Sequence, residues 1–416
     1  MLGGDRGGFG CLEVGTVSSQ RRMTNAERRA RLVVRHHLGG TAGDVLDAVR
    51  CVAAMHSSDP VTPYLGVRAR LRGFAVSGLE HALYEDRSLL RIHAMRRTLF
   101  VVPSTEAPLI HAAAGREDAA RERRRLEGWV AAELGAKDGK ALLTRAEAAL
   151  LELLGDGRER GTREIIAALP ELGTPIIVGS GTWATRVPLV SRLVLVLGME
   201  RRIVRGRPAG SWRSSQYRWA VAAQWVDEAP KWPDPAAARV ELARRYLATH
   251  GPATLADLRW WAGWTARHAA AAIASLRAVP VQLEDGGDAF VLPGDDAPVE
   301  LPRPTVAFLP GLDSTPMGWK ERSWFLGEHG PLVYDRNGNA GPTVWVDGRI
   351  VGAWSQDSAG EVVYRLLEDV GSEAAESIAA EAASLTHWLG GDVVATRFPS
   401  PLERELAGTS RTSRRS

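Results

Sequence analysis

Two segments of the chain repeat the same order of hydrophobic and polar positions. In each segment, apolar residues recur at the spacing of amphipathic helices, and a shorter stretch then alternates as a β-hairpin does. The expected elements are 144–157, 162–170, 183–200 and 201–220 in the first segment, and 235–251, 253–263, 265–278 and 280–293 in the second. Three helices followed by a hairpin is the plan of a winged-helix module, whose third helix can enter the major groove of DNA. The repetition therefore predicts tandem winged-helix modules.

The second helix of each segment begins near a threonine, Thr162 or Thr254, and each threonine is followed by an acidic residue. A threonine hydroxyl can accept a hydrogen bond from the first turn of a helix, and a carboxylate there is favoured by the helix dipole. We therefore expect these threonines to be N-caps.

Residues 24–103 resemble a third, more divergent copy of the same order. We expect a recognition-type helix over 77–85 and a hairpin wing over 89–103. Asp59 followed by Pro60 predicts the start of another helix, because aspartate caps helices and proline is favoured at the first helical position.

Beyond the Pro-rich linkers at 229–237 and 293–305 the pattern changes to short alternating runs. The expected strands are 306–314, 331–337, 342–356 and 392–399, with one helix around 373–389. Asp347-Gly348 joins two β-rich runs and predicts a hairpin. This pattern indicates a C-terminal β-rich unit.

The fold class predicted from these patterns is α+β, with three tandem winged-helix modules followed by a C-terminal β-rich domain. The expected divisions are a disordered or mis-assigned N-terminal extension (1–22), a first module with its connector (23–140), a second module (141–228), a third module (235–293), the β-rich domain (304–408) and a disordered tail (409–416).

Composition excludes several classes of protein. Hydrophobic residues make up 45% of the 416 residues and charged residues 24%, which is ordinary for a globular protein. Cys11 and Cys51 are too far apart for a zinc motif, and they do not suggest a disulfide framework. No run reaches the roughly 18 apolar residues that a membrane span needs. We therefore expect a monomer located in the cytoplasm that uses neither a metal nor another cofactor and does not bind membranes.

Net charge is only +3, and nearly all of the basic residues are arginine. Arginine suits phosphate contacts through its planar fork, although a GC-rich genome would produce the same bias. A small net charge is compatible with DNA binding, because only one face of the protein has to be basic.

The segment Met55-His56-Ser57-Ser58-Asp59-Pro60 carries the strongest candidate chemistry. His56 can act as a general base for a water, and Ser58 could orient that water or bond a sugar or phosphate oxygen. The alternative for both is an ordinary turn with local hydrogen bonds, and for Asp59 it is helix capping.

The run from Leu38 to Phe74 resembles the signature region of the AlkZ/YcaQ family of winged-helix DNA glycosylases. LPGLDSTPMGWKER (309–322) and VWVDGRIVGAW (344–354) resemble that family's late motifs. The resemblance covers roughly residues 25–400. It implies tandem winged helices around a DNA-binding concavity and removal of alkylated purines, with unhooking of interstrand crosslinks in some members.

The family's catalytic motif, Gln-x-Gln or Gln-x-Asp, falls on His56-Ser57-Ser58, so this chain departs from it at both polar positions. An N7- or N3-alkylated purine is already cationic and leaves with little acid help, so a polar pair that positions a water remains chemically sufficient. The resulting hypothesis is a monofunctional DNA glycosylase with His56 and Ser58 as catalytic residues and damaged double-stranded DNA as partner. The alternative is a non-catalytic DNA-binding protein, either a regulator or a lesion-binding module.

Further candidates extend this site. The expected DNA-binding residues are Arg68, Arg70 and Arg72 on the helix after the motif, and His93, Arg96 and Arg97 on the first wing. Asp59 and Asp313 are expected to support the active site, although a turn-capping role for Asp313 is the competing interpretation.

Overall fold

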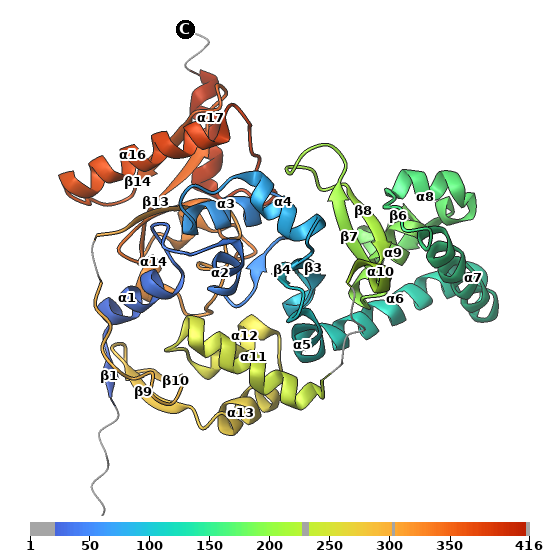
Figure 1. The fold of residues 1–416 in the computed structure, drawn as a ribbon, viewed down its shortest axis with the longest axis horizontal. Helices are drawn as coiled ribbons and strands as arrows, with labels where there is room; N and C mark the ends of the chain where they lie inside the picture. The colour runs from blue at the N-terminus through green and yellow to red at the C-terminus, as the bar shows by residue number, and fades with distance from the viewer. Residues whose placement is uncertain (1–20, 227–232, 302–303, 413–416) are drawn as a thin grey trace, which may run out of the picture.

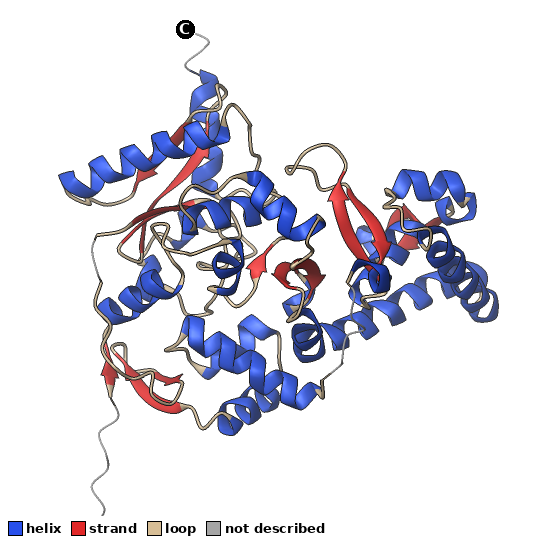
Figure 2. Cartoon of the chain, viewed as in Figure 1, coloured by secondary structure: helices blue, strands red, loops and turns tan. Residues whose placement is uncertain are grey.

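The computed structural model describes residues 21–226, 233–301 and 304–412, which form an α+β protein with several small sheets (Figures 1 and 2). Residues 1–20 of the expected extension lie outside the described residues. Arg21 and Arg22 do not belong to such an extension, because strand β1 (Arg22–Met23) pairs in parallel with β9 (Val279–Leu283). The boundary of the folded chain therefore lies earlier than we predicted.

The first group of elements surrounds a three-stranded sheet with the order β2-β4-β3. Its elements are α1 (Asn25–Arg35), α2 (Val45–Arg50), β2 (Met55–His56), α3 (Thr62–Arg70), α4 (Val76–Tyr84), β3 (Leu89–His93) and β4 (Leu99–Pro103). The expected hairpin over 89–103 and helix over 77–85 are both present. Helix α3 begins at Thr62 with Val61 as its N-cap residue, so the predicted start at Pro60 is wrong by two residues.

A connector leads to the second group through α5 (Ala107–Ile110), the π-helical turn His111–Gly115 and α6 (Arg116–Leu134). The second group comprises α7 (Ala136–Leu154), α8 (Thr162–Ala168), β5 (Pro175–Val178), β6 (Thr185–Pro188), α9 (Leu189–Met199), β7 (Ile203–Pro208), β8 (Tyr217–Val221) and α10 (Ala222–Trp225). The hairpin of β5 and β6 was not predicted, and the helix expected over 183–200 begins only at Leu189.

The third group follows the predicted order. Its elements are α11 (Pro235–His250), α12 (Leu255–Ala262), α13 (Ala266–Ser275), β9 and β10 (Asp288–Val291). Thr254 caps α12 as expected, since its hydroxyl accepts from the Asp257 amide at 3.0 Å and the Asp257 carboxylate accepts from the Thr254 amide. In α8, by contrast, Gly161 takes the cap position and Thr162 is the first helical residue.

The C-terminal region contains an antiparallel sheet with the order β11-β12-β13-β14. Its elements are β11 (Val306–Leu309), α14 (Ser323–Leu326), α15 (Gly330–Val333), β12 (Thr343–Val346), β13 (Arg349–Gln356), β14 (Val362–Leu366), α16 (Ser372–Leu389) and α17 (Pro401–Thr412). Two predicted strands are wrong, because 331–337 contains α15 and 392–399 is a loop. The tail expected from 409 is helical through Thr412, and 413–416 lie outside the described residues.

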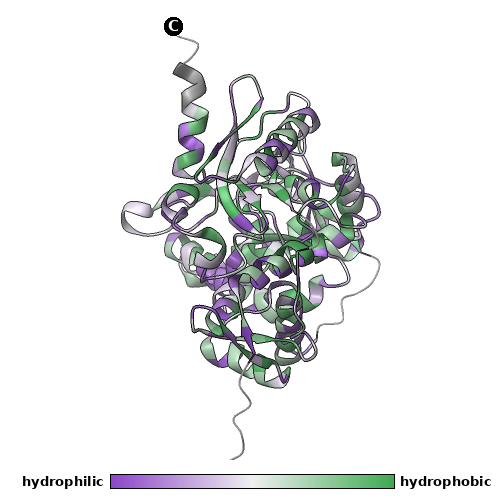
Figure 3. Ribbon diagram, turned by 90° about the vertical axis from the view of Figure 1, so that its left-hand side faces the viewer, coloured by the Kyte–Doolittle hydropathy of each residue, from purple (hydrophilic) through white to green (hydrophobic). Residues whose placement is uncertain are grey.

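Hydrophobic side chains form two principal cores. The larger core joins the first group, the third group and the C-terminal sheet, and it also takes in Val204, Trp212, Ala220 and Trp225 of the second group. Residues from α6 to β8 enclose a separate core that includes Leu193 and Trp219. Figure 1 shows this second group beside the rest of the molecule, connected through α6. Apolar and polar residues mix along the helices, as amphipathic patterning requires (Figure 3).

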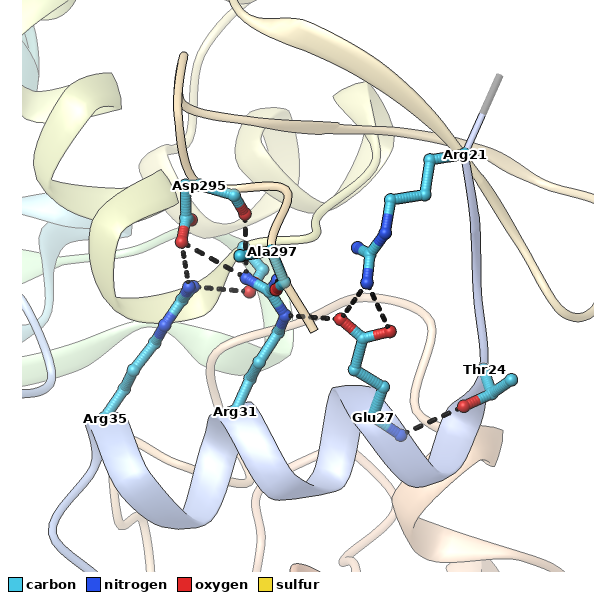
Figure 4. A network of polar contacts seen from close by, with 8 residues as sticks. Arg21, Thr24, Glu27, Arg31, Arg35, Asp295 and Ala297 are labelled. Atoms are coloured by element: carbon cyan, nitrogen blue, oxygen red, sulfur yellow. Dashed lines mark hydrogen bonds and ion pairs between the residues drawn. The ribbon is translucent and has the colours of Figure 1, made fainter. Parts of the chain in front are cut away.

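A polar network fixes helix α1 to the segment that follows β10 (Figure 4). The buried Arg31 donates to the carboxylates of Glu27 and Asp295 and to the carbonyl of Ala297, and Arg35 donates to Asp295 at 2.6 Å. Arg21 donates to both oxygens of Glu27. These bonds hold α1, at the start of the first group, against the segment that follows β10 at the end of the third group.

Candidate functional site

A cleft of about 830 Å³ opens between the first group and the second group. One wall comes from the turn after β2 and from the β3–β4 hairpin, and the other comes from α8, α9 and the β7–β8 hairpin. Arg397, from the loop before α17, also lines it. The cleft is large enough for a nucleotide, since small-molecule sites typically measure about 300–1,000 Å³.

The lining of the cleft is strongly basic. Its charged lining residues are the five arginines Arg97, Arg163, Arg205, Arg218 and Arg397 and the single carboxylate Glu164. The Glu164 carboxylate accepts from the Gly161 amide at 2.6 Å and so belongs to the start of α8. This excess of positive charge suits a polyanion, although the whole chain carries a net charge of only +3.

Ser57 and Ser58 lie on the cleft wall directly after β2. The Ser58 hydroxyl accepts from the Leu99 amide at 3.2 Å, and the Ser57 hydroxyl accepts from Arg91 at 3.1 Å. The second strand of the wing therefore holds Ser58, and a buried guanidinium holds Ser57. Both hydroxyls are fixed at the place where the sequence predicted chemistry.

His56 is separated from the cleft. Its side chain is 4% exposed, it is not among the residues lining the cleft, and its ring meets Phe100 edge-on. Nδ1 accepts weakly from the Ser58 amide at 3.4 Å. Burial, with a contribution from Arg96, lowers the pKa of His56 to about 3. His56 is therefore neutral and lies behind Ser58, which corrects the expectation that it acts on a water in the cleft.

Asp59 also faces away from the cleft. Its carboxylate accepts from the Arg397 amide at 2.8 Å and weakly from the Val61 amide, and burial raises its pKa. It therefore joins the start of α3 to the loop before α17. This role is structural, close to the capping alternative, although Asp59 is not the N-cap residue itself.

The three arginines expected on a DNA-binding helix face do not form one. Arg68 pairs with Glu381 and bonds Ser384 at 2.8 Å, which ties α3 to α16. Arg72 is exposed but lies outside the cleft. Arg70 is fully buried. Helix α3 is covered on nearly all sides, so Arg68 and Arg70 contribute to packing between elements.

Arg70 and Asp313 form a buried bidentate ion pair. The two guanidinium nitrogens donate to the two carboxylate oxygens at 2.7 and 2.8 Å, and Arg70 also donates to Thr315 at 2.7 Å. Burial opposes the charged form, but Asp313 raises the pKa of Arg70 above its usual value. Asp313 therefore anchors α3 to the loop after β11 and is not among the residues that line the cleft.

The three candidate DNA-binding residues on the first wing have different surroundings. His93 and Arg97 line the cleft, and Arg97 pairs with Glu122 at 2.6 Å. Arg96 turns to the third group, where its guanidinium lies 4.0 Å from the ring centroid of Trp260. Arg96 and Arg97 both have positive φ, which a tight hairpin turn of this hand requires. The turn thus directs the two neighbouring side chains to different partners.

Sequence reasoning missed the opposite wall of the cleft. Arg205, Tyr217 and Trp219 lie on the β7–β8 hairpin, where basic and aromatic residues alternate in the sequence. That alternation was a usable signal for a hairpin face, but it could not show that this face meets the first wing.

Other classes of site receive no support from the part of the chain described. No group of three or more His, Cys, Asp or Glu side chains there could hold a metal ion. Among the same residues, no helix combines the length and apolarity needed to cross a membrane.

Comparison with known proteins agrees with the fold and with the family that the sequence resembles. Residues 49–388 match the family model described as "DNA glycosylase AlkZ-like". The structure is similar to that of the Streptomyces sahachiroi DNA glycosylase AlkZ, with a TM-score of 0.66 and 20% sequence identity over 90% of this chain and 99% of that one. No curated protein sequence matches this chain. Because the family model spans most of the 416 residues, the chain belongs to the AlkZ-like DNA glycosylase family.

Proposed function

We propose that this protein binds damaged double-stranded DNA in the basic cleft and hydrolyses the N-glycosidic bond of an alkylated or bulky purine nucleotide, interstrand crosslinks included. The observation that carries the proposal is the position of Ser57 and Ser58. They form part of a wall of the cleft whose charged lining is five arginines and one glutamate. A phosphate backbone fits that charge, and the tripeptide His56-Ser57-Ser58, on which the resemblance places the family's motif, ends at that wall.

The three groups of helices and hairpins act in this proposal as three winged-helix modules, at 23–140, 141–228 and 235–293, followed by the β-rich domain at 304–408. The order of helix, helix, helix and hairpin in the second and third groups supports it. The isolated β-bridges of Arg160 with Trp219 and of Ala253 with Phe290 also support the proposal, because each adds a third stretch of backbone to a hairpin. The protein works on DNA as a monomer.

In the reaction, Ser58 is the catalytic residue that contacts the water or the sugar, and His56 is a positioning residue behind it. The leaving base is cationic, so the protein has to hold the nucleotide and direct a water but need not protonate the base strongly. The Ser58 hydroxyl faces the cleft with its lone pairs oriented by the Leu99 amide. His56 stays neutral because of its burial and accepts the Ser58 amide, which fixes the serine backbone.

The test is strand cleavage at an abasic product. A duplex with one N7-methylguanine, and a second duplex with an N7-linked crosslink, are incubated with wild type, Ser58→Ala and Arg336→Ala and then heated in alkali. Arg336 is exposed and outside the cleft, so its variant controls for general effects of losing a charge. We expect breaks with wild type and Arg336→Ala, and at least a tenfold slower release with Ser58→Ala. Equal release by Ser58→Ala and wild type would remove Ser58 from the mechanism.

A second candidate is a non-catalytic DNA-binding protein that recognises lesions or regulates genes. The burial of His56 and the lack of a carboxylate at residues 56–58 favour it. In that case the same duplexes would be bound without any alkali-labile product. A sequence-specific footprint on undamaged DNA would identify a regulator, and preference for the damaged duplex would identify a lesion-binding module.

A further inference from the structure

Two guanidinium groups, those of Arg91 and Arg205, lie near the ring of Tyr217 at the cleft. Arg91, on β3, is 5% exposed and donates to the hydroxyls of Ser57 and Tyr84. Arg205, on β7, lines the cleft, and its nearest polar contact is Nδ1 of His93 at 3.4 Å. In the described part of the chain neither arginine forms an ion pair, whereas the cleft residue Arg97 pairs with Glu122.

The surroundings of Arg205 are aromatic. Its guanidinium carbon lies 4.7 Å from the ring centroid of Trp219 and 5.8 Å from that of Tyr217, and Arg91 lies 5.2 Å from the same tyrosine ring. Aromatic faces attract a cation but replace only part of its lost hydration. The pKa of Arg205 falls to about 10, mainly because of burial; Tyr217 opposes the fall and the charge of Arg91 adds to it. The folded protein therefore maintains a positive charge here at a cost in stability.

Tyr217 provides a second polar group at the same place that a ligand could bind. Its hydroxyl is buried and has no hydrogen-bond partner among the residues that the structure describes, and the residue lines the cleft beside Arg205. A buried hydroxyl without a partner is unfavourable, so it marks a place where a ligand atom can complete the bond. Arg205 and Tyr217 together offer several N–H donors and one O–H donor to a single acceptor group.

We propose that Arg205 and Tyr217, with Arg91 behind them, form a phosphate subsite that holds one DNA phosphodiester in the cleft, opposite Ser57 and Ser58. This proposal rests on the proposed function, because it takes DNA as the occupant. A phosphodiester carries one negative charge and two free oxygens, which fit the planar fork of Arg205 and the phenol of Tyr217. A cationic alkylpurine would be repelled here, so the damaged base occupies another part of the cleft.

His93 has a positioning role in this subsite. Burial, followed by the charge of Arg205, lowers its pKa well below the usual value, so the ring is neutral. Its Nδ1 can then accept from Arg205 and hold the guanidinium in place. This explains why a histidine expected to contact DNA lies on the cleft wall with only 8% of its surface exposed.

The test combines variants with DNA in which single phosphates are replaced by uncharged methylphosphonates. The proteins are wild type, Arg205→Met, Arg205→Lys, Tyr217→Phe and, as an exposed arginine outside the cleft, Arg336→Met. Affinity for a lesion-bearing duplex is measured by fluorescence anisotropy at several salt concentrations. We expect Arg205→Met to weaken binding on the order of 10- to 100-fold and to reduce the log–log salt slope by about one. Tyr217→Phe loses roughly threefold to tenfold with an unchanged slope, because it removes no charge.

One methylphosphonate position should weaken binding by wild type while leaving Arg205→Met unaffected. If every methylphosphonate position weakened binding by Arg205→Met as much as binding by wild type, the subsite would be overturned. The melting temperature of Arg205→Met should equal or exceed that of wild type, because an unpaired charge is removed from a largely buried place. If this variant does not fold, Arg205→Lys and Tyr217→Phe test the subsite instead. We expect Arg205→Lys to retain the salt slope but lose affinity. Wild-type affinity in both variants would overturn the subsite.

A second measurement separates this proposal from the proposed function. Inorganic phosphate should raise the melting temperature of wild type and have a smaller effect on Arg205→Met. If wild type binds no DNA but shows this difference, the proposed function fails and the anion site stands. If wild type binds and cleaves DNA while Arg205→Met is indistinguishable in affinity, salt slope and response to phosphate, the subsite fails and the proposed function stands.

Discussion

At the scale of single residues, the ion pair of Arg70 and Asp313 connects α3 to the loop after β11. Both side chains are buried, and their geometry is bidentate. Arg70→Met would leave the Asp313 carboxylate buried without its partner, and we expect it to lower the free energy of unfolding by about 3–5 kcal/mol. Urea denaturation followed by tryptophan fluorescence measures this. The double variant Arg70→Met/Asp313→Leu should lose much less, and a double variant as unstable as the sum of the single ones would contradict the argument.

The same pair shows why single-residue roles were hard to predict. Arg70 lies on the helix after the candidate motif at 55–60, and its partner Asp313 lies 243 residues away in the sequence. No local pattern reports such a distant carboxylate. Ser58 lines the cleft, whereas His56, two positions earlier and expected beside it, does not. The difference arises because β2 ends at His56 and Phe100 of the neighbouring strand covers its ring.

At the scale of elements, α17 is held by a buried carboxylic acid. Glu403 is 7% exposed, and its carboxylate accepts from the Ser400 amide. Burial, with the nearby charge of Asp59 adding to it, raises its pKa to about 7. The folded state therefore binds a proton that the unfolded state releases between about pH 4.5 and 7, and stability falls as pH rises through that window.

Glu403→Gln removes this titration and keeps an acceptor for the Ser400 amide. We expect the variant to be more stable than wild type by about 2 kcal/mol at pH 8 and to differ little at pH 5. Chemical denaturation at the two pH values measures the difference. A stability gain of the same size at both pH values would show that the effect does not come from titration of Glu403.

The second group of helices should behave as a separate unit of stability, since it has its own core. Leu193 on α9 is fully buried in that core, and Leu193→Ala should cost about 2–5 kcal/mol locally. Hydrogen exchange should then speed up in α7, α9 and β7 while β11–β13 keep their protection. Val351→Ala on β13 is the matched variant for the larger core. Equal loss of protection in both regions with either variant would show a single cooperative unit.

Elements with strong local signals were predicted well, and elements set by distant contacts were not. The 89–103 and 280–293 hairpins and α16 follow from alternation and helical spacing. Residues 185–188 pair with β5 as a strand, although they directly precede the apolar run of α9 and were expected to be part of that helix, because tertiary pairing overrides propensity in so short a stretch. The 331–337 segment is also short, and its first residues belong to α15.

At the scale of the whole molecule, the cleft arises where the two cores meet. The first wing belongs to the larger core, and the β7–β8 hairpin borders the smaller one. Helical spacing and hairpin signals predict each group alone, but the way that α6 places one group beside the other is a property of packing. The basic surface is therefore assembled from segments whose individual charges are unremarkable in the sequence.

Five buried histidines give the whole fold a predictable response to acid. Burial is the largest cause lowering the pKa of each, and the residues are His36, His56, His93, His111 and His250. They are neutral in the folded state, whereas the unfolded chain protonates them near pH 6.5. Their contribution to stability is therefore present above pH 6.5 and is lost as pH falls toward their folded pKa values, about 4 for His111 and about 3 for His56 and His250. Glu403 opposes this trend, as do Asp59 and Asp118, whose pKa values burial also raises.

We expect the free energy of unfolding to fall by several kcal/mol between pH 6.5 and 5, because each such histidine contributes up to about 1.4 kcal/mol per pH unit. Urea denaturation at half-unit steps of pH measures the slope. His56→Gln, which introduces an uncharged amide at the family's motif position, should reduce that slope by roughly one proton. Ser58→Ala changes no titrating group and should preserve it. A slope in His56→Gln equal to that of wild type would mean that His56 is protonated in the folded protein, and the neutral positioning role proposed for it would then be wrong.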